Sequence, residues 1–232
     1  MVIWGLYMHF KNISDLNSRI TSCRQCPRLV EWRESIAQTK RKAFAEEMYW
    51  GRPLPGFGDP HAKLVIIGLA PAAHGANRTG RMFTGDRSGE WLYRALHKAG
   101  FGNQPHARSK NDGLKLTNAY ITTIVRCAPP ANKPTPEERD ICMEYMIQEL
   151  RLLKRAKILL LLGSFVWDGT LQVLSKIGHS VRPKPTFSHG AQSQVGPYTL
   201  VGSYHPSQQN TFTGRLTKPM FDAVFSQTKR LI

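Results

Sequence analysis

Four cysteines are the residues of this chain with the clearest chemical potential. Cys23 and Cys26 form a C-x2-C pair, and Cys127 and Cys142 follow much later in the sequence. Four thiolates can hold a tetrahedral zinc ion or an iron–sulfur cluster. Zinc modules usually close with a second C-x2-C pair, which this chain lacks. The spacing leaves three alternatives: zinc, an iron–sulfur cluster, or buried free thiols with a chance C-x2-C.

Three long polar loops hold the other candidate reactive side chains, at residues 68–86, 126–134 and 202–215. Asp86 is the one acidic residue in the first two loops, and a carboxylate there can orient or deprotonate a water molecule. His205, in the third loop, can donate a hydrogen bond to an oxygen that gains negative charge during a reaction. Loops of this length carry function more often than short structural connections do.

Further residues of these loops suit a planar ligand. Gly68 and the small residues after it let such a ligand approach the backbone, and Phe83 can stack on its face. Asn132 and Asn210 carry amide groups that can read a base edge or contact a phosphate. These residue types suit a planar ligand, and they leave open whether the amides contact a base or a phosphate.

Each of these side chains also has a purely structural explanation. Asp86 can cap the helix that follows it, and Phe83 can belong to the core. His74 and His205 can simply pack within their loops. Convergence of the three loops at one place would favour the chemical roles over the structural ones.

The elements that would position these loops alternate between strands and helices. Apolar or β-branched runs predict strands at residues 63–70, 119–125, 157–163 and 198–204. Helices are expected at residues 89–99, from a capping box at Thr135 onward, at 164–177 and at 216–231. This alternation predicts an α/β protein with a single-domain, three-layer α/β/α fold around a central four-stranded parallel sheet. Ligands of such sheets bind at the carboxyl ends of the strands, where the three loops begin.

We expect residues 1–232 to form one domain. Residues 1–62 would supply an N-terminal helix and a wrapping segment that carries the first two cysteines, and residues 63–232 would supply the α/β core.

The composition narrows the class of protein further. The 232 residues include 32 Lys and Arg against 16 Asp and Glu, for a formal net charge of +16. Such a balance is typical of nucleic-acid binding, although an anionic membrane surface would also attract it. An apolar content of 41% excludes a disordered chain, and the longest apolar run, Ile158–Leu162, is too short to span a membrane. The N-terminus lacks the features of a secretory signal, so we expect an intracellular protein, in which reduced thiols favour metal binding over disulfides.

At the loops the sequence resembles a known family. Residues 68–75, 77–81 and 83–86 are similar to motif 1 of the family 5 uracil-DNA glycosylases. Two further blocks of that family resemble residues 127–130 with 132–134, and residues 203–207 with 209–211 and 213–216. Its N-terminal cluster motif resembles Cys23–Leu29. The resemblance spans nearly the whole chain in the right order.

The resemblance implies a DNA repair enzyme that hydrolyses the N-glycosidic bond of uracil, and often of other deaminated bases such as hypoxanthine. The expected product is an abasic site without strand cleavage. The resemblance also implies a [4Fe–4S] cluster on Cys23, Cys26, Cys127 and Cys142. It indicates Asp86, His205 and Asn132 as the catalytic residues. Other branches of the superfamily place an Asp, Glu or Asn just after the first strand, where this chain has Ala70, Pro71, Ala72 and Ala73.

The remaining expected contacts fall into two groups. The base is expected to contact Gly68, Leu69, Ala70, Ala72, Ala73, His74, Phe83 and Asn210. The DNA backbone and base stack are expected to contact Arg78, Arg81, Ser207, Gln208, Gln209 and Arg215. The expected partner is single- or double-stranded DNA and not a membrane. The expected protein is a monomer in the cytoplasm of a prokaryotic cell, associated with the nucleoid.

Three other functions stay open at this point. The chain can be an iron–sulfur protein that binds nucleic acid without catalysis, a uracil-restricted enzyme like those of family 4, or an iron–sulfur nuclease. A nuclease needs clustered carboxylates for a divalent metal ion, and no Asp or Glu pair occurs in the three loops.

Overall fold

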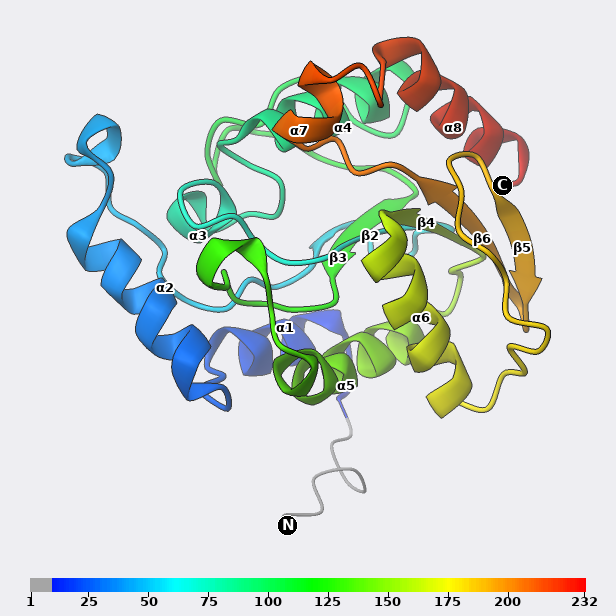
Figure 1. The fold of residues 1–232 in the computed structure, drawn as a ribbon, viewed down its shortest axis with the longest axis horizontal. Helices are drawn as coiled ribbons and strands as arrows, with labels where there is room; N and C mark the ends of the chain where they lie inside the picture. The colour runs from blue at the N-terminus through cyan, green and yellow to red at the C-terminus, as the bar shows by residue number, and fades with distance from the viewer. Residues whose placement is uncertain (1–9) are drawn as a thin grey trace.

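The fold is shown in Figure 1 by a computed structural model that describes residues 10–232. The residues at which a secretory signal was sought lie outside this range. The strands are β1 (Phe57–Gly58), β2 (Leu64–Gly68), β3 (Ala119–Thr123), β4 (Ile158–Leu162), β5 (Gln192–Val195) and β6 (Tyr198–Ser203). The helices are α1 (Ile13–Thr21), α2 (Pro27–Thr39), α3 (Ala76–Thr79), α4 (Arg87–Lys98), α5 (Pro136–Leu152), α6 (Ser164–Lys176), α7 (Gln208–Phe212) and α8 (Lys218–Arg230). Two 3-10 turns, η1 (Lys42–Phe44) and η2 (Pro130–Asn132), complete the set.

The sheet has the strand order β1-β3-β2-β4-β6-β5. Its four central strands are parallel and are the four predicted from the sequence, so the expected parallel core is confirmed. Two antiparallel edge strands extend it to six strands. The sequence gives no apolar run for either edge strand: β1 is two residues long, and β5 reads Gln-Ser-Gln-Val with mostly solvent-facing side chains.

Helices cover both faces of this sheet. Every residue of β2, β3 and β4 is buried, which explains their unbroken runs of apolar or β-branched residues. One buried cluster joins the sheet to α1, α5 and α6, and a second cluster joins the other face to α4 and α8. Figure 1 shows these helices on the two sides of the sheet, which confirms the expected three layers.

Local signals set where the helices begin. The side chain of Thr135 accepts a hydrogen bond from the Glu138 amide, and the Glu138 carboxylate accepts one from the Thr135 amide, so the predicted capping box opens α5. Helix α4 begins at Arg87, two residues earlier than predicted, because Asp86 caps it. Across residues 10–232, none of the helices combines the length and apolarity that a membrane span requires.

Candidate active site

The first and third loops leave the same edge of the sheet. Strands β2, β4 and β6 are parallel neighbours, so β2 and β6 both deliver their following loops to the carboxyl edge. Backbone hydrogen bonds continue past the strands, from the Ile124 amide to the Gly68 carbonyl (3.0 Å) and from the Val125 amide to the Leu69 carbonyl (2.9 Å). The second loop therefore starts beside the first.

Phe83 lies at the base of this edge. Its backbone has φ 53°, in the left-handed region that non-glycine residues seldom adopt. Its ring lies against Gly68, where an added Cβ would come within 2.8 Å of the ring carbon Cζ. Gly68 is therefore required for this close approach. The Phe83 side chain is 9% exposed, so it borders both the core and the loop surface, and both roles considered for it are compatible with its position.

His205 faces Phe83 from the end of β6. The two ring centroids are 6.0 Å apart and the rings are inclined by 31°. Burial lowers the pKa of His205 to about 4, so the imidazole is neutral at pH 7. The Asn210 side-chain amide donates a hydrogen bond to the His205 carbonyl at 2.9 Å. One N–H of this amide thereby holds the His205 backbone.

Asp86 combines a structural and a candidate chemical role. Its Oδ1 accepts a hydrogen bond from the Gly89 amide at 2.9 Å, so it is the N-cap of α4. Its Oδ2 lies against Gly75, and any Cβ at that glycine would clash with it. Burial raises the pKa of Asp86, and hydrogen bonds from the amides of Gly89 and Ser88 oppose that rise. Capping uses one carboxylate oxygen and leaves the other beside the first loop.

Two further predicted site residues are His74 and Asn132. His74 packs in its loop, with Nδ1 3.1 Å from the Tyr49 hydroxyl, and burial lowers its pKa. Asn132 ends the turn η2 in the left-handed region, with φ 57°, and is exposed. Among residues 10–232 its side chain makes no hydrogen bond, so it is free to meet a ligand.

Arg78 and Arg81, which we expect at the DNA from the sequence, are both buried and paired. Their side chains are only 8% and 3% exposed. Arg78 pairs with Glu47 and donates to the His74 carbonyl at 2.8 Å. Arg81 forms two hydrogen bonds of 2.8 Å with Asp112. Both guanidinium groups are used to hold the first loop together, so they are not free for phosphates.

The residues after His205 form the short helix α7 and its exit. Ser207 caps α7 by accepting a hydrogen bond from the Asn210 amide, while Gln208, Gln209 and Arg215 are exposed. The Arg215 guanidinium carbon lies 4.7 Å from the centroid of the Tyr204 ring. These exposed side chains are placed where a DNA contact is feasible.

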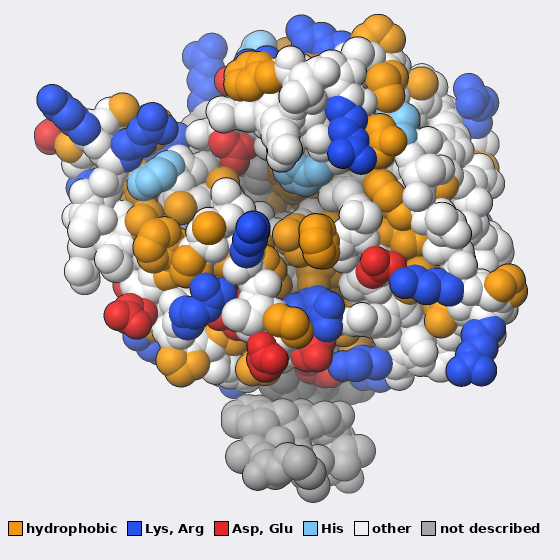
Figure 2. Space-filling model, viewed as in Figure 1, with side chains coloured by type: hydrophobic (Ala, Val, Ile, Leu, Met, Phe, Trp, Pro, Cys, Tyr) orange, Lys and Arg blue, Asp and Glu red, His pale blue; other side chains and the backbone are white. Residues whose placement is uncertain are grey.

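Sequence reasoning did not bring together Arg87 of α4 and Phe212 of α7. Phe212 is 68% exposed, and the Arg87 guanidinium carbon lies 4.4 Å from its ring centroid. The Arg87 Nε also donates to the Thr211 hydroxyl at 3.3 Å. A large aromatic side chain in an otherwise polar segment was the available signal. Figure 2 shows a recess in the viewed face, below α7 as it is placed in Figure 1.

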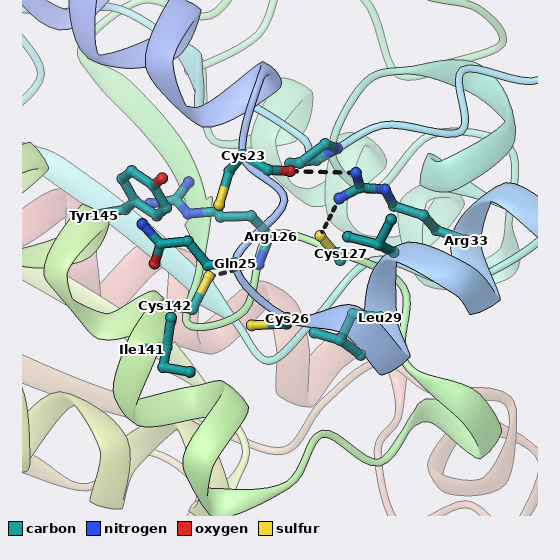
Figure 3. Close-up of a pocket in the computed structure, with 12 residues that line it drawn as sticks. Cys23, Gln25, Cys26, Leu29, Arg33, Arg126, Cys127, Ile141, Cys142 and Tyr145 are labelled. Carbon is teal, nitrogen blue, oxygen red and sulfur yellow. Dashed lines mark hydrogen bonds between the residues drawn. The ribbon is translucent and has the colours of Figure 1, made fainter. Parts of the chain in front are cut away.

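The four cysteines line a second pocket, drawn in Figure 3. Cys23 and Cys26 lie between α1 and α2, Cys127 follows β3, and Cys142 belongs to α5. The Arg33 Nη1 donates to the Cys127 sulfur at 2.9 Å, and the Arg126 amide donates to the Cys142 sulfur at 3.3 Å. The long gap in sequence between the two pairs is therefore closed in space.

The cysteines and guanidinium groups that line this pocket suit an anionic cluster larger than a single metal ion. Arg33 Nε and two guanidinium nitrogens of Arg126 are buried without a hydrogen-bond partner among residues 10–232, and both arginines line the pocket. Within those residues, no three His, Cys, Asp or Glu side chains are close enough to hold a single metal ion. A zinc ion would need its sulfurs within about 4 Å of one another, given Zn–S bonds of about 2.3 Å. A cluster that takes each thiolate on a different iron needs no such closeness.

The fold has three layers, α/β/α, and its polar loops lie at the carboxyl edge of the sheet. Proteins of this architecture bind their ligands at that edge. The family model of the uracil DNA glycosylase superfamily matches residues 55–229. The chain therefore belongs to the uracil-DNA glycosylase superfamily.

The named relatives are more specific. The type-5 uracil-DNA glycosylase of Mycobacterium tuberculosis is 52% identical over 95% of this chain and 82% of its own length. The type-5 enzyme of Thermus thermophilus is 49% identical over 91% of this chain and 94% of its own length. A type-4 uracil-DNA glycosylase of Archaeoglobus fulgidus is 28% identical over 67% of this chain and 61% of its own length. The similarity is thus stronger to the type-5 enzymes than to this type-4 enzyme.

Proposed function

We propose that this chain excises uracil from DNA by hydrolysing the N-glycosidic bond and leaving an abasic site. The observation that carries this proposal is the contact between Phe83 and a neutral His205 at the carboxyl edge of the sheet. The family and its type-5 relatives support the same reaction. The net charge of +16 supports DNA as the substrate, because a cationic surface attracts the phosphate backbone.

The proposed reaction starts with a nucleotide that leaves the base stack. Flipping costs a few kcal/mol, and it costs least for a mispaired base, which contributes to selectivity. The everted base would lie against Phe83 and the backbone of residues 68–73. That wall is made of glycine, leucine, alanine and proline, so it offers backbone groups and apolar surface but no side-chain amide. Such a wall is tolerant of different bases, which supports activity on hypoxanthine as well as uracil.

Bond cleavage develops negative charge on the departing base and positive charge on the sugar. The neutral His205 would donate a hydrogen bond to the base oxygen that gains charge. The second oxygen of Asp86 would stabilise the sugar cation and direct the attacking water. Asn210 and Ser207 act on this chemistry indirectly, since they fix the backbone after His205. Asn132 would assist from the exposed turn of the second loop.

We also propose that the four thiolates hold a [4Fe–4S] cluster in the pocket of Figure 3. Its support is the set of four cysteines together with the unpartnered N–H groups of Arg33 and Arg126. When bound, the cluster supplies a cross-link between the α1–α2 connection, the start of the second loop and α5. Replacement of Cys127 by Ser should remove iron and visible absorbance from the purified protein. A wild-type protein that carries zinc and no iron would contradict the cluster.

The enzyme activity is tested with duplex and single-stranded DNA that contains uracil or hypoxanthine. We expect alkali-labile sites in the uracil strand, no breaks before alkali, and the same result in EDTA. Intact strands after alkali would indicate a protein that only binds nucleic acid. Cleavage of uracil alone would indicate a uracil-restricted enzyme, and breaks before alkali would contradict the monofunctional reaction. The monomeric state and the nucleoid-associated cytoplasmic location stay predictions from the sequence.

A further inference from the structure

A basic arm projects from the molecule beside the first loop. We define the arm as residues 40–48, which run from the end of α2 through η1 to the buried Tyr49. Figure 1 shows this segment extending beyond the rest of the fold at the upper left. Figure 2 shows Lys and Arg side chains on it together with an acidic one, and the recess below α7 lies to the right of the arm. The arm is not part of any role assigned above.

Internal contacts hold the arm in one shape. The Lys40 Nζ donates to the Ala45 carbonyl at 2.8 Å, and the Phe44 amide donates to the Arg41 carbonyl at 2.7 Å. The Phe44 ring lies 3.8 Å from the guanidinium carbon of Arg78, which also pairs with Glu47. An arm fixed in this way loses little conformational entropy when it binds a partner.

The arm is fastened to the loop that borders the proposed base site. The Tyr49 hydroxyl contacts His74 Nδ1 at 3.1 Å, and the amide of Trp50 donates to the Arg78 carbonyl at 2.9 Å. The Arg41 charge is near enough to His74 to help lower the pKa of that imidazole, after the larger effect of burial. The arm therefore has a fixed position relative to residues 68–86.

The cations at the tip of the arm are left without acidic partners. Arg41 and Lys42 are exposed, and neither forms an ion pair within residues 10–232. The two acidic residues of the arm do not pair with them: Glu47 pairs with Arg78, and the exposed Glu46 forms no ion pair within residues 10–232. Exposed and unpaired cations on a backbone held in place suit a partner with regularly spaced anions, as the DNA backbone has.

We propose that Arg41 and Lys42 bind phosphates of the damaged DNA, so that the arm is a second, preformed backbone contact on the side of the recess away from α7. This inference rests on the proposed function, because it takes DNA as the substrate. The contact carries no sequence information and acts on affinity and on placement of the duplex over the recess.

The test is the salt dependence of binding to a duplex that contains an uncleavable abasic-site analogue. We compare the wild type with R41S/K42S by fluorescence anisotropy between low and moderate salt. Loss of two phosphate contacts should make the slope of log K against log salt shallower by about 1.8, since each contact contributes about 0.9. The loss of affinity should be largest at low salt. The single variant K42S should change the slope by about half as much, and it provides a second measurement if the double variant folds poorly.

The matched control is K154S/R155S. Lys154 and Arg155 are adjacent, exposed and basic like the arm pair, but they precede β4 and so lie toward the opposite edge of the sheet. Their removal changes the net charge equally and should leave the slope within error of the wild type. Equal slopes for wild type and R41S/K42S, or equal losses in both double variants, would overturn the arm contact while wild-type uracil excision stands. Absence of excision by the wild type would instead overturn the proposed function.

Discussion

The His205 ring lies 6.0 Å from the ring of Phe83, although the two residues follow the first and the last strand of the parallel core. They meet because β2 and β6 both flank β4 in parallel, and because Gly68 gives the Phe83 ring room to lie against the end of β2. A separation of 6.0 Å is within the range of neighbouring aromatic pairs, so we expect the base beside the two rings and not stacked between them. An everted base would meet the aromatic face and the neutral imidazole at neighbouring points of one surface.

Replacement of His205 by Gln should slow base excision far more than it weakens DNA binding. The loss of a hydrogen bond made mainly in the transition state is expected to lower the single-turnover rate by about 10²–10³-fold. Glutamine keeps a polar side chain of similar reach, and the Asn210 contact is to the backbone, so the fold of the third loop should persist. Single-turnover kinetics with enzyme in excess, beside a binding isotherm, separate the two effects. An unchanged rate with weaker binding would remove His205 from the chemistry.

The same variant tests the pKa of His205. Its pKa is about 4 in the folded protein, against about 6.5 in the unfolded chain, so between these values only the unfolded state binds the proton. The free energy of unfolding should therefore rise with pH across this window and lose this dependence above pH 6.5. The difference between wild type and H205Q should grow by about 3 kcal/mol from pH 4 to pH 6.5. Urea titrations at several pH values measure it, and a constant difference would contradict burial of a neutral imidazole.

Two substitutions at Asp86 separate its cap from its charge. Asn is as good an N-cap as Asp, so Asp86→Asn should keep the hydrogen bond to the Gly89 amide and the thermal midpoint while lowering turnover by about 10²-fold or more. Asp86→Ala should lower turnover similarly and also cost about 1 kcal/mol of stability. Kinetics and thermal unfolding of the pair are measured together. Wild-type turnover in Asp86→Asn would leave only the capping role.

The parallel core and the meeting of the first and third loops were predictable because they follow from local patterns. Apolar or β-branched runs mark β2, β4 and β6, and their parallel arrangement brings the loops after β2 and β6 to one edge. The edge strand β5 was not predictable, since three of its four residues are polar and only Val195 is buried. The hydrogen-bond partners of Arg81 and Asn210 were not predictable for another reason. A basic or amide side chain shows its chemistry in the sequence, but not whether a partner such as Asp112 has already used it.

Arg81 is buried whereas Arg215 is exposed, and this difference predicts opposite effects of their removal. Arg81 is buried against Asp112, and although burial alone would raise the pKa of that carboxyl, the Arg81 hydrogen bonds and nearby backbone amides hold it well below its usual range. Arg81→Ala removes the cationic partner of the half-buried Asp112 and the packing of the Arg81 side chain itself, so it should destabilise the fold by about 3 kcal/mol and leave the salt slope of DNA binding unchanged.

Arg215 is exposed over the Tyr204 ring. We therefore expect Arg215→Ala to leave the stability nearly unchanged and to alter the salt dependence of DNA binding. Its removal should change the free energy of unfolding by less than about 0.5 kcal/mol and make the salt slope shallower by about 0.9. Urea unfolding and anisotropy at several salt concentrations decide both halves of the contrast. A shallower slope in a fully stable Arg81→Ala protein would return Arg81 to the DNA-binding surface, because only a guanidinium free of Asp112 could produce it.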